Sequence, residues 1–426
     1  MNLAKTRGKS PFIRYWFGLA LLLLSVSLSG LIWYSPDSPP PEQRSIDSAE
    51  HDIIDAERDF PDVSPAYGVL PGEFENHDGL LIGSPVEIPP DAPPRAVKLR
   101  RYANQTLFEV IANTPPDLQI LVAAPSIQDK RRILAQFTQA KLPIDRIHVI
   151  VTEIETNWVR DFAPYSMRHD RMTWIATIFD PLLQERTADA AMAWSFSTRC
   201  DVAPVRSQLA LDGGNLITNG EGLFLTTKFT LDLNRRRGFW KRDVSRLLRH
   251  DLGAKQIVYL DSLSGDMNRH VDMFLTMPAP DTIVLAEFSA EQDPRNHEIL
   301  EQNYRRLQSL RRNGQPLKIL RVPMPPRGSN ITFGGTYTNV VYANGVLFVP
   351  RFEGVDEAGH AKALEVYRQI LPDWKIVSIE SSAWIAMNGS LHCLTKNLFN
   401  LPPAFLSRSR LQSRTAQLDP SRTACE

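Results

Sequence analysis

This chain has little of several features that would identify its function quickly. Its 426 residues include only three cysteines, and 48 basic residues balance 48 acidic residues to a formal net charge of zero. Without a net charge there is no overall field to concentrate nucleic acid, so we set nucleic-acid binding aside. No Gly-x-Gly-x-x-Gly sequence follows a predicted strand, which disfavours a plain dinucleotide-binding fold. The 43% hydrophobic content is nevertheless enough to bury a sizeable core.

The two ends of the chain differ from its middle. A basic stretch over residues 1–15 precedes an apolar run over 16–34 that is long enough to cross a bilayer as a helix. A cleaved signal peptide is the alternative, but no clear small-residue cleavage site follows. Positive charge before the run predicts a single-pass membrane protein with a cytoplasmic N-terminus and an extracytoplasmic, periplasmic or cell-surface, catalytic domain. We expect a Pro-rich linker over 35–64, a catalytic domain over 65–406 and a loose tail over 407–426.

In the middle, short apolar runs alternate with helical patterns, which predicts an α/β domain. Asn219-Gly220 and Asn344-Gly345 each separate two apolar runs and suit the positive backbone angles of a two-residue hairpin turn. Candidate strands are residues 80–82, 119–123, 146–152, 174–179, 257–260, 283–288, 318–322 and 376–379. Helical patterns cover residues 97–113, 127–140, 241–252, 292–312 and 357–371.

Four clusters carry side chains that could act together on a cationic substrate. They are Trp158–Asp161, Leu211–Asn215, Arg269–Phe274 and Ser390–Asn397, the last of which contains Cys393. A guanidinium is planar, cationic and resonance-stabilised. Its hydrolysis needs a strong nucleophile, acceptors for its N–H groups and a proton for the departing ammonia. The clusters offer a thiol, a histidine and several carboxylates for these tasks.

In this order and spacing the clusters resemble the agmatine deiminase and bacterial, Porphyromonas-type peptidylarginine deiminase family of guanidino-modifying enzymes. Pro71–Glu75 and the Asn388–Cys393 approach are further marks of that family, and the resemblance runs from about Gly72 to Asn397. It implies a five-bladed α/β propeller, the pentein fold, of ββαβ units around a central site. It also implies hydrolysis of a guanidino group, in agmatine or in an arginine-containing peptide, to a ureido product and ammonia.

The resemblance assigns the catalytic roles to four residues. Cys393 would attack the guanidinium carbon as a thiolate, and His270 would protonate the leaving nitrogen and then activate water against the thiouronium intermediate. Asp161 and Asp272 would accept the guanidinium N–H groups, because two carboxylate oxygens match two parallel donors. On a strand, His270 and Asp272 would point to the same face. A substrate cation beside Cys393 would also favour its thiolate form.

Other residues of the clusters have supporting or structural interpretations. Asp212 would support the site, for example by orienting His270, and Trp158 could line the pocket, although aromatic residues beside strands are more often core. Arg269 could contact a substrate carboxylate. Arg160 is interpreted as structural, holding a neighbouring acid. His392 would point away from Cys393 on an extended segment and is also interpreted as structural.

We expect neither a cofactor nor a metal. The His270-Val271-Asp272 sequence gives at most two metal ligands, and no second histidine or cysteine cluster lies nearby in the sequence. Outside the cytoplasm, Cys200 and Cys425 could pair and leave Cys393 free. The oligomeric state stays open.

Several positions depart from the family pattern and leave the substrate open. Arg269 stands where glycine is usual, Phe74 where tryptophan is common, Asp212 where glutamate is frequent, and Phe162-Ala163-Pro164 replaces Thr-Gly-Pro. Export of the catalytic domain through a membrane favours an arginine-containing peptide over agmatine, and so does Arg269, which could contact the carboxylate of a peptide. Three alternatives remain: an amidinotransferase with the same nucleophile, a membrane-tethered guanidino-binding protein without chemistry, and a structural membrane-attached domain.

Overall fold

The computed structural model describes residues 54–55, 62–168, 172–179, 186–326, 335–352 and 354–408. These residues belong to one compact unit that spans Asp52–Glu426. The predicted basic N-terminus over 1–15, the membrane span over 16–34 and nearly all of the predicted linker over 35–64 lie outside the described residues. Of the predicted tail, only residues 407 and 408 are described, and Arg408 forms a 2.7 Å ion pair with Asp201.

The structure corrects the predicted membrane location. None of the helices within the described ranges is both long and apolar enough to span a bilayer. The apolar run that motivated the prediction falls among residues whose structure is not described. The predicted single-pass membrane location is therefore wrong for the described residues, which contain no such span.

Four sheets within the described residues repeat one order of elements. In each sheet two antiparallel strands are followed by one or two helices and then by a strand parallel to the second. The first has β5 (Tyr165–Ser166), β6 (Trp174–Ile178), α5 (Thr187–Arg199) and β7 (Val205–Ala210), and the second has β8 (Ile217–Thr218), β9 (Leu223–Thr227), α6 (Phe229–Arg235), α7 (Lys241–Leu252) and β10 (Gln256–Leu260). The third has β11 (Leu275–Ala279), β12 (Thr282–Glu287), α8 (Pro294–Leu307) and β15 (Lys318–Pro323), and the fourth has β16 (Val341–Ala343), β17 (Val346–Arg351), α9 (Glu357–Ile370) and β18 (Lys375–Glu380).

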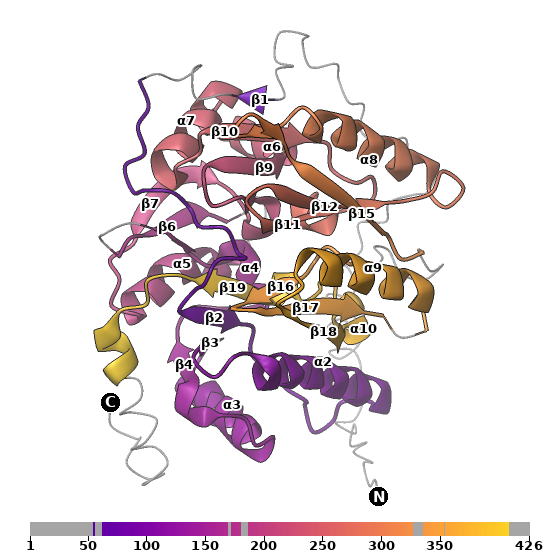
Figure 1. The fold of residues 1–426 in the computed structure, drawn as a ribbon. Helices are drawn as coiled ribbons and strands as arrows, with labels where there is room; N and C mark the ends of the chain where they lie inside the picture. The colour runs from indigo at the N-terminus through magenta and orange to yellow at the C-terminus, as the bar shows by residue number, and fades with distance from the viewer. Residues whose placement is uncertain are drawn as a thin grey trace, which may run out of the picture. The chain divides into compact units, whose positions relative to one another are not determined.

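A fifth sheet has the same order, but its first strand comes from the other end of the domain. The yellow strand β19 (Thr395–Leu398) lies antiparallel beside the indigo strand β2 (Gly79–Ile82), with Asn397 opposite Leu80 (Figure 1). Helix α2 (Pro94–Asn113) then leads to β3 (Gln119–Ala124), and α3 (Ile127–Gln139) and the 3-10 turn η4 (Ile144–Arg146) lead to β4 (Ile147–Val151). Both β3 and β4 run parallel to β2.

The remaining described elements are short. Strand β1 (Ile54–Asp55) adds antiparallel to β10, and β13 (Arg311–Arg312) forms a small hairpin with β14 (Gln315–Pro316). The others are α4 (Val159–Phe162), η5 (Gly213–Asn215), η6 (Val271–Met273), α10 (Ser382–Ile385) and η7 (His392–Leu394).

Burial explains why the strands read as short apolar runs. Every residue of β2 and β3 is buried, as is expected where parallel strands are covered on both faces. Helices flank the sheets: α2 and α3 lie near β3 and β4, whereas α8 and α9 lie beside the sheets of β12 and β17 (Figure 1). Trp384 of α10 is buried in the same core as β3, and its indole N–H donates to the Ala103 carbonyl of α2 at 2.9 Å.

Most helix and hairpin predictions agree with the structure, with instructive exceptions. Helix α7 has the predicted bounds, whereas α8 ends at Leu307 because the chain then turns into the hairpin of β13 and β14. Asn344 and Gly345 both have positive φ, as the predicted two-residue turn requires. The other hairpin differs: residues 219–222 connect β8 to β9, and Gly220 and Gly222 have positive φ there. Helices α5 and α6 were not predicted from the sequence.

Candidate active site

The predicted site residues lie on four short turns that contact one another. Cys393 lies in η7 directly before β19, Asp161 lies in α4, and Asp212 directly precedes η5. His270 precedes η6, and Asp272 lies within it. Helix α4 contacts both η5 and η7, and η5 in turn contacts η6. Residues that are far apart in the sequence therefore meet at the ends of different sheets.

Gly214 marks the point where three of these side chains converge. A Cβ atom placed on Gly214 would lie 2.6 Å from Nδ1 of His270 and 3.0 Å from a carboxylate oxygen of Asp161 and of Asp272. The Gly214 N–H also points to Asp161 Oδ1 at 3.3 Å. A glycine is required here because any side chain would fill the space between the histidine and the two acids.

His270 lies among carboxylates and is almost fully buried. Its Nε2 is 3.3 Å from Asp212 Oδ2, and its Nδ1 is 3.7 Å from Asp161 Oδ1. Burial lowers the pKa of the imidazole, but the negative charges of Asp161, Asp212 and Asp272 outweigh it and raise the pKa to about 10. His270 is therefore a cation at neutral pH and can donate a proton.

Asp161 is a buried acid that lies close to other acids. Burial and the neighbouring charges of Asp212 and Asp272 raise the pKa of Asp161 to about 6, although His270 opposes the shift. A cationic ligand beside Asp161 would relieve this like-charge repulsion. The site is thus electrostatically suited to a cation.

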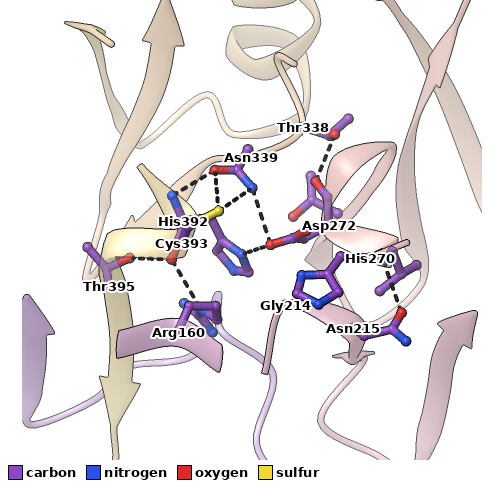
Figure 2. Close-up of polar contacts among 12 residues, drawn as sticks. Arg160, Gly214, Asn215, His270, Asp272, Thr338, Asn339, His392, Cys393 and Thr395 are labelled. Atoms are coloured by element: carbon purple, nitrogen blue, oxygen red, sulfur yellow. Dashed lines mark hydrogen bonds and ion pairs between the residues drawn. The ribbon is translucent and has the colours of Figure 1, made fainter. Parts of the chain in front are cut away.

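The thiol of Cys393 is buried and contacts one side-chain amide. Its Sγ is 3.8 Å from Nδ2 and 3.9 Å from Oδ1 of Asn339 (Figure 2). The thiol can donate to Oδ1, and the thiolate can accept from Nδ2. Burial, together with Asp272 and Asp161, raises the pKa of Cys393 well above its usual value. In the absence of a ligand the thiol form is therefore favoured.

The two carboxylate oxygens of Asp272 differ in their surroundings. Oδ2 is 2.7 Å from Nδ1 of His392 and accepts from Nδ2 of Asn339 at 3.2 Å (Figure 2). Oδ1 is buried and has no hydrogen-bond partner among the described residues. A buried acceptor without a partner is costly, so Oδ1 is suited to a ligand N–H group.

Two interpretations made from the sequence are wrong. His270 and Asp272 are not on a strand; they flank and enter the 3-10 turn η6, and they converge because that turn is tight. His392 does not point away from the site, because η7 is also a 3-10 turn and turns the imidazole toward Asp272. Strand alternation does not apply to either segment.

Arg160 has a structural position, but its partners differ from the neighbouring acid that the sequence suggests. Its guanidinium forms an ion pair with Glu73, and its Nε donates to the His392 carbonyl at 3.2 Å. Its remaining contact is Asn397 at 3.3 Å. Arg160 therefore holds the turn that carries Cys393.

The other predicted residues lie further from this cluster. Trp158 packs edge-on against Trp384 at 5.7 Å and lies against Gly389, so its observed contacts are packing contacts. Arg269 is 48% exposed, lies over the Phe229 ring and is 3.9 Å from Asp232. Cys200 is a buried thiol that ends α5, and Cys425 lies outside the described residues, so their pairing stays a hypothesis.

Three residues of the cluster had no assigned role in the sequence analysis. Asn339 lies at the start of the apolar run before the predicted turn at Asn344 and Gly345, and Glu73 was named only as one of the marks of the family. Lys396 is buried and follows Cys393 closely, and its Nζ lies 3.7 Å from the centre of the Tyr165 ring. Burial lowers the pKa of Lys396 to about 7. A lysine three positions after the candidate nucleophile was the available signal.

Known proteins resemble this chain in sequence and in fold. The model of the Porphyromonas-type peptidyl-arginine deiminase family matches residues 69–398. A putative agmatine deiminase of Legionella pneumophila is 26% identical over 265 residues, which cover 59% of this chain and 74% of that protein. An agmatine deiminase of Ectopseudomonas mendocina is 24% identical over 305 residues, covering 62% and 80%.

Solved structures share the fold. Agmatine deiminase of C. jejuni has a TM-score of 0.64 at 21% identity, covering 78% of this chain and 96% of that one. A putative arginine deiminase from Porphyromonas gingivalis has a TM-score of 0.65 at 20% identity, covering 78% and 98%. Together the fold and the family match define a hydrolase that acts on guanidino carbon–nitrogen bonds. The chain belongs to the Porphyromonas-type peptidyl-arginine deiminase family.

Proposed function

We propose that this protein is a deiminase that converts a guanidino group to a ureido group and ammonia through a covalent intermediate on Cys393. The observation that carries the proposal is the buried Oδ1 of Asp272, which has no hydrogen-bond partner in the described part of the chain and lies near a thiol, a cationic histidine and a second buried acid. A guanidinium would supply the missing N–H donor and the missing positive charge together. Neither a neutral nor an anionic ligand would do both.

The reaction balances with the groups present. The Cys393 thiolate attacks the guanidinium carbon, and the tetrahedral adduct expels one nitrogen as ammonia, which takes its proton from His270. The resulting thiouronium is attacked by a water molecule that His270, now neutral, deprotonates. Collapse of the second adduct expels the thiolate, and the hydroxyl proton of that adduct passes to solvent, which leaves the ureido product. For each guanidinium, one water is consumed, and one ammonia and one proton are released.

The substrate also helps to form the nucleophile. Asp272 and Asp161 favour the thiol form of Cys393 in the empty site, and a bound guanidinium neutralises both charges and adds its own. The thiolate is thereby favoured mainly when substrate is present, and Asn339 can change from acceptor to donor as the thiol loses its proton. Asp161 and Asp272 act as the guanidinium acceptors, and Asp212 orients His270.

The architecture that fits this proposal is a five-bladed α/β propeller with the site at its centre. Five described sheets share the ββαβ order, and the pairing of β19 with β2 joins the two ends of the domain. The turns that carry the acids, the histidine and the thiol come from different sheets. The catalytic domain would span residues 65–406, as the sequence predicts.

The substrate class is a guanidino compound, either agmatine or arginine within a peptide. The family name points to peptidyl-arginine, and the relatives named above are called agmatine deiminases. Trp158 and Arg269 are the residues available to contact the part of the substrate beyond the guanidinium. An exposed Arg269 suits a substrate carboxylate and would disfavour the distal amine of agmatine.

The test is release of ammonia and ureido product from agmatine, free arginine and short arginine peptides, with Cys393→Ala as the control. We expect turnover of one substrate class and none by the variant. Added amine acceptors separate hydrolysis from amidino transfer, because a transferase would give a new guanidine in place of the ureido product. Binding without turnover of any substrate would identify a guanidino-binding protein and contradict the proposal.

A further inference from the structure

The imidazole of His392 lies between two carboxylates. Its Nδ1 is 2.7 Å from Asp272 Oδ2, and its Nε2 is 2.8 Å from Glu73 Oε2. Ionised carboxylates only accept hydrogen bonds, and a neutral imidazole has only one N–H group. Both short contacts are satisfied together when both ring nitrogens carry a proton. The contacts therefore favour the imidazolium form of His392.

The outer end of this arrangement is fixed by a second cation. Glu73 forms an ion pair with Arg160 through its other oxygen. Arg160, His392 and Lys396 together lower the pKa of Glu73, although burial opposes them. Glu73 is therefore ionised and cannot supply the proton that one of the two contacts to His392 requires. Arg160 also holds the His392 carbonyl, so both the ring and the backbone of His392 are fixed.

On its other side the His392 imidazole contacts Asp272, the acid whose Oδ1 has no hydrogen-bond partner among the described residues. Asp272 Oδ2 receives His392 and Asn339, and this fixes the plane of the carboxylate while Oδ1 keeps no partner among the residues described. Asp272 and Asp161 lie close together across Gly214, so their negative charges repel each other. A positive charge held at Oδ2 reduces that repulsion.

We propose that His392 is a positioning residue: as an imidazolium held by Glu73, it fixes the Asp272 carboxylate through Oδ2 and turns Oδ1 toward the substrate guanidinium. The proposal rests on the proposed deimination for its ligand. Charges alternate along Arg160, Glu73, His392 and Asp272, and each is bound to the next. Because both ring nitrogens are occupied, His392 transfers no proton in the reaction, and acid–base chemistry stays with His270.

Two substitutions and one control distinguish this role of His392 from a role in packing. His392→Gln retains one neutral N–H donor but removes the charge and one of the two contacts. Glu73→Gln keeps the shape of the outer partner and removes its charge. His360→Gln is the matched control, because His360 is a buried histidine of α9 that lies outside the site and whose Nε2 is 3.3 Å from the Ser378 hydroxyl. We expect the control to match the wild type in every assay.

The kinetic expectation is a change in substrate affinity. His392→Gln should raise KM by about 10-fold or more, because a charge-assisted bond to the guanidinium is weakened. A smaller change in kcat is expected. In Glu73→Gln the groups that face His392 are Asp272 and Arg160, so the imidazolium loses one of two stabilising charges. The alkaline limb of kcat/KM should then move to lower pH, and a merely structural role would not move it.

Two measurements test the proposal without turnover. In protein labelled with 15N-histidine, both ring nitrogens of His392 should carry protons at pH 8 in the wild type, with a lower titration midpoint in Glu73→Gln. In the Cys393→Ser background, calorimetric titration with agmatine and with an arginine peptide should show about 10-fold weaker binding after His392→Gln. A neutral His392 at pH 8, or unchanged affinity, overturns the proposal even if the enzyme is an active deiminase. A protonated His392 and weakened binding in a protein without turnover would support it while the proposed reaction fails.

Discussion

Replacing Asp272 with asparagine should slow deimination and accelerate alkylation of the Cys393 thiol. The asparagine oxygen can keep the hydrogen bonds that Oδ2 accepts from His392 and Asn339. The amide NH2 group then occupies the place of Oδ1 and presents N–H groups to the guanidinium N–H groups. A charge-assisted hydrogen bond is lost and a donor–donor contact replaces it.

The expected magnitude follows from that exchange. A hydrogen bond to a charged group contributes about 1.5–3 kcal/mol, so kcat/KM should fall by about 10- to 150-fold or more. The same substitution removes a negative charge that raises the pKa of the Cys393 thiol. We therefore expect that pKa to fall and alkylation of Cys393 at pH 8 to accelerate.

The assay pairs steady-state deimination with the rate of iodoacetamide alkylation at Cys393, followed by mass spectrometry from pH 7 to 10. Cys200 is a buried thiol in the same chain and serves as an internal standard for intact folding. Faster alkylation with slower turnover is the expected result. If both rates fall while Cys200 stays protected, Asp272 does not control the thiol electrostatically and the reasoning is refuted.

Further predictions concern pH, backbone strain, a buried cation and metal dependence. The kcat/KM profile should be bell-shaped, rising near pH 6 as Asp161 ionises and falling near pH 10 as His270 loses its proton; a profile with no acidic limb would contradict the role of Asp161. Arg269→Gly should stabilise the protein by up to about 1 kcal/mol in urea titrations, because Arg269 has φ 57°, where a side chain is strained. The same substitution should raise KM for arginine peptides but not for agmatine. Equal effects on both substrates would exclude contact of Arg269 with a substrate carboxylate. Lys396→Met should stabilise the protein by about 2–4 kcal/mol at pH 7, because the folded state lowers the lysine pKa from 10.5 to about 7. The wild type should gain stability between pH 7 and 10.5, where the unfolded chain binds one more proton than the folded chain. A difference in stability that does not depend on pH would argue against the buried charge. EDTA should leave deimination unchanged, and loss of activity that added metal restores would show that a metal is needed.

The sequence predicted much of the local structure because strand and helix signals are local. Helix α7 has the predicted bounds, and the turn at Asn344 and Gly345 has the predicted backbone angles, because propensity and patterning act within a few residues. Helix α5 was missed because its apolar residues are spread around the helix and not gathered on one face.

The candidate site was predicted as a set of residues but not as a geometry. Cys393, His270 and the acids could be named from their clusters. The inward direction of His392 could not, because it depends on a 3-10 turn that strand alternation does not describe. Asn339 and Glu73 contact the cluster only through long-range packing, so a single sequence gave no local reason to connect either residue with Cys393.

The pairing of β19 with β2 makes completion of the chain a condition for having a nucleophile. The acids and the histidine are synthesised before the turn that carries Cys393. That turn is anchored to the start of the domain by contacts such as Asn397 to His77, 320 residues apart in the sequence. Closing so long a loop carries an entropic cost and belongs to the slow steps of folding. A nascent or C-terminally clipped chain would therefore hold the acids without the thiol and would expose the edge of β2, which invites pairing with other chains. Pairing of β19 with β2 therefore completes the sheet and places the nucleophile in the site in the same step.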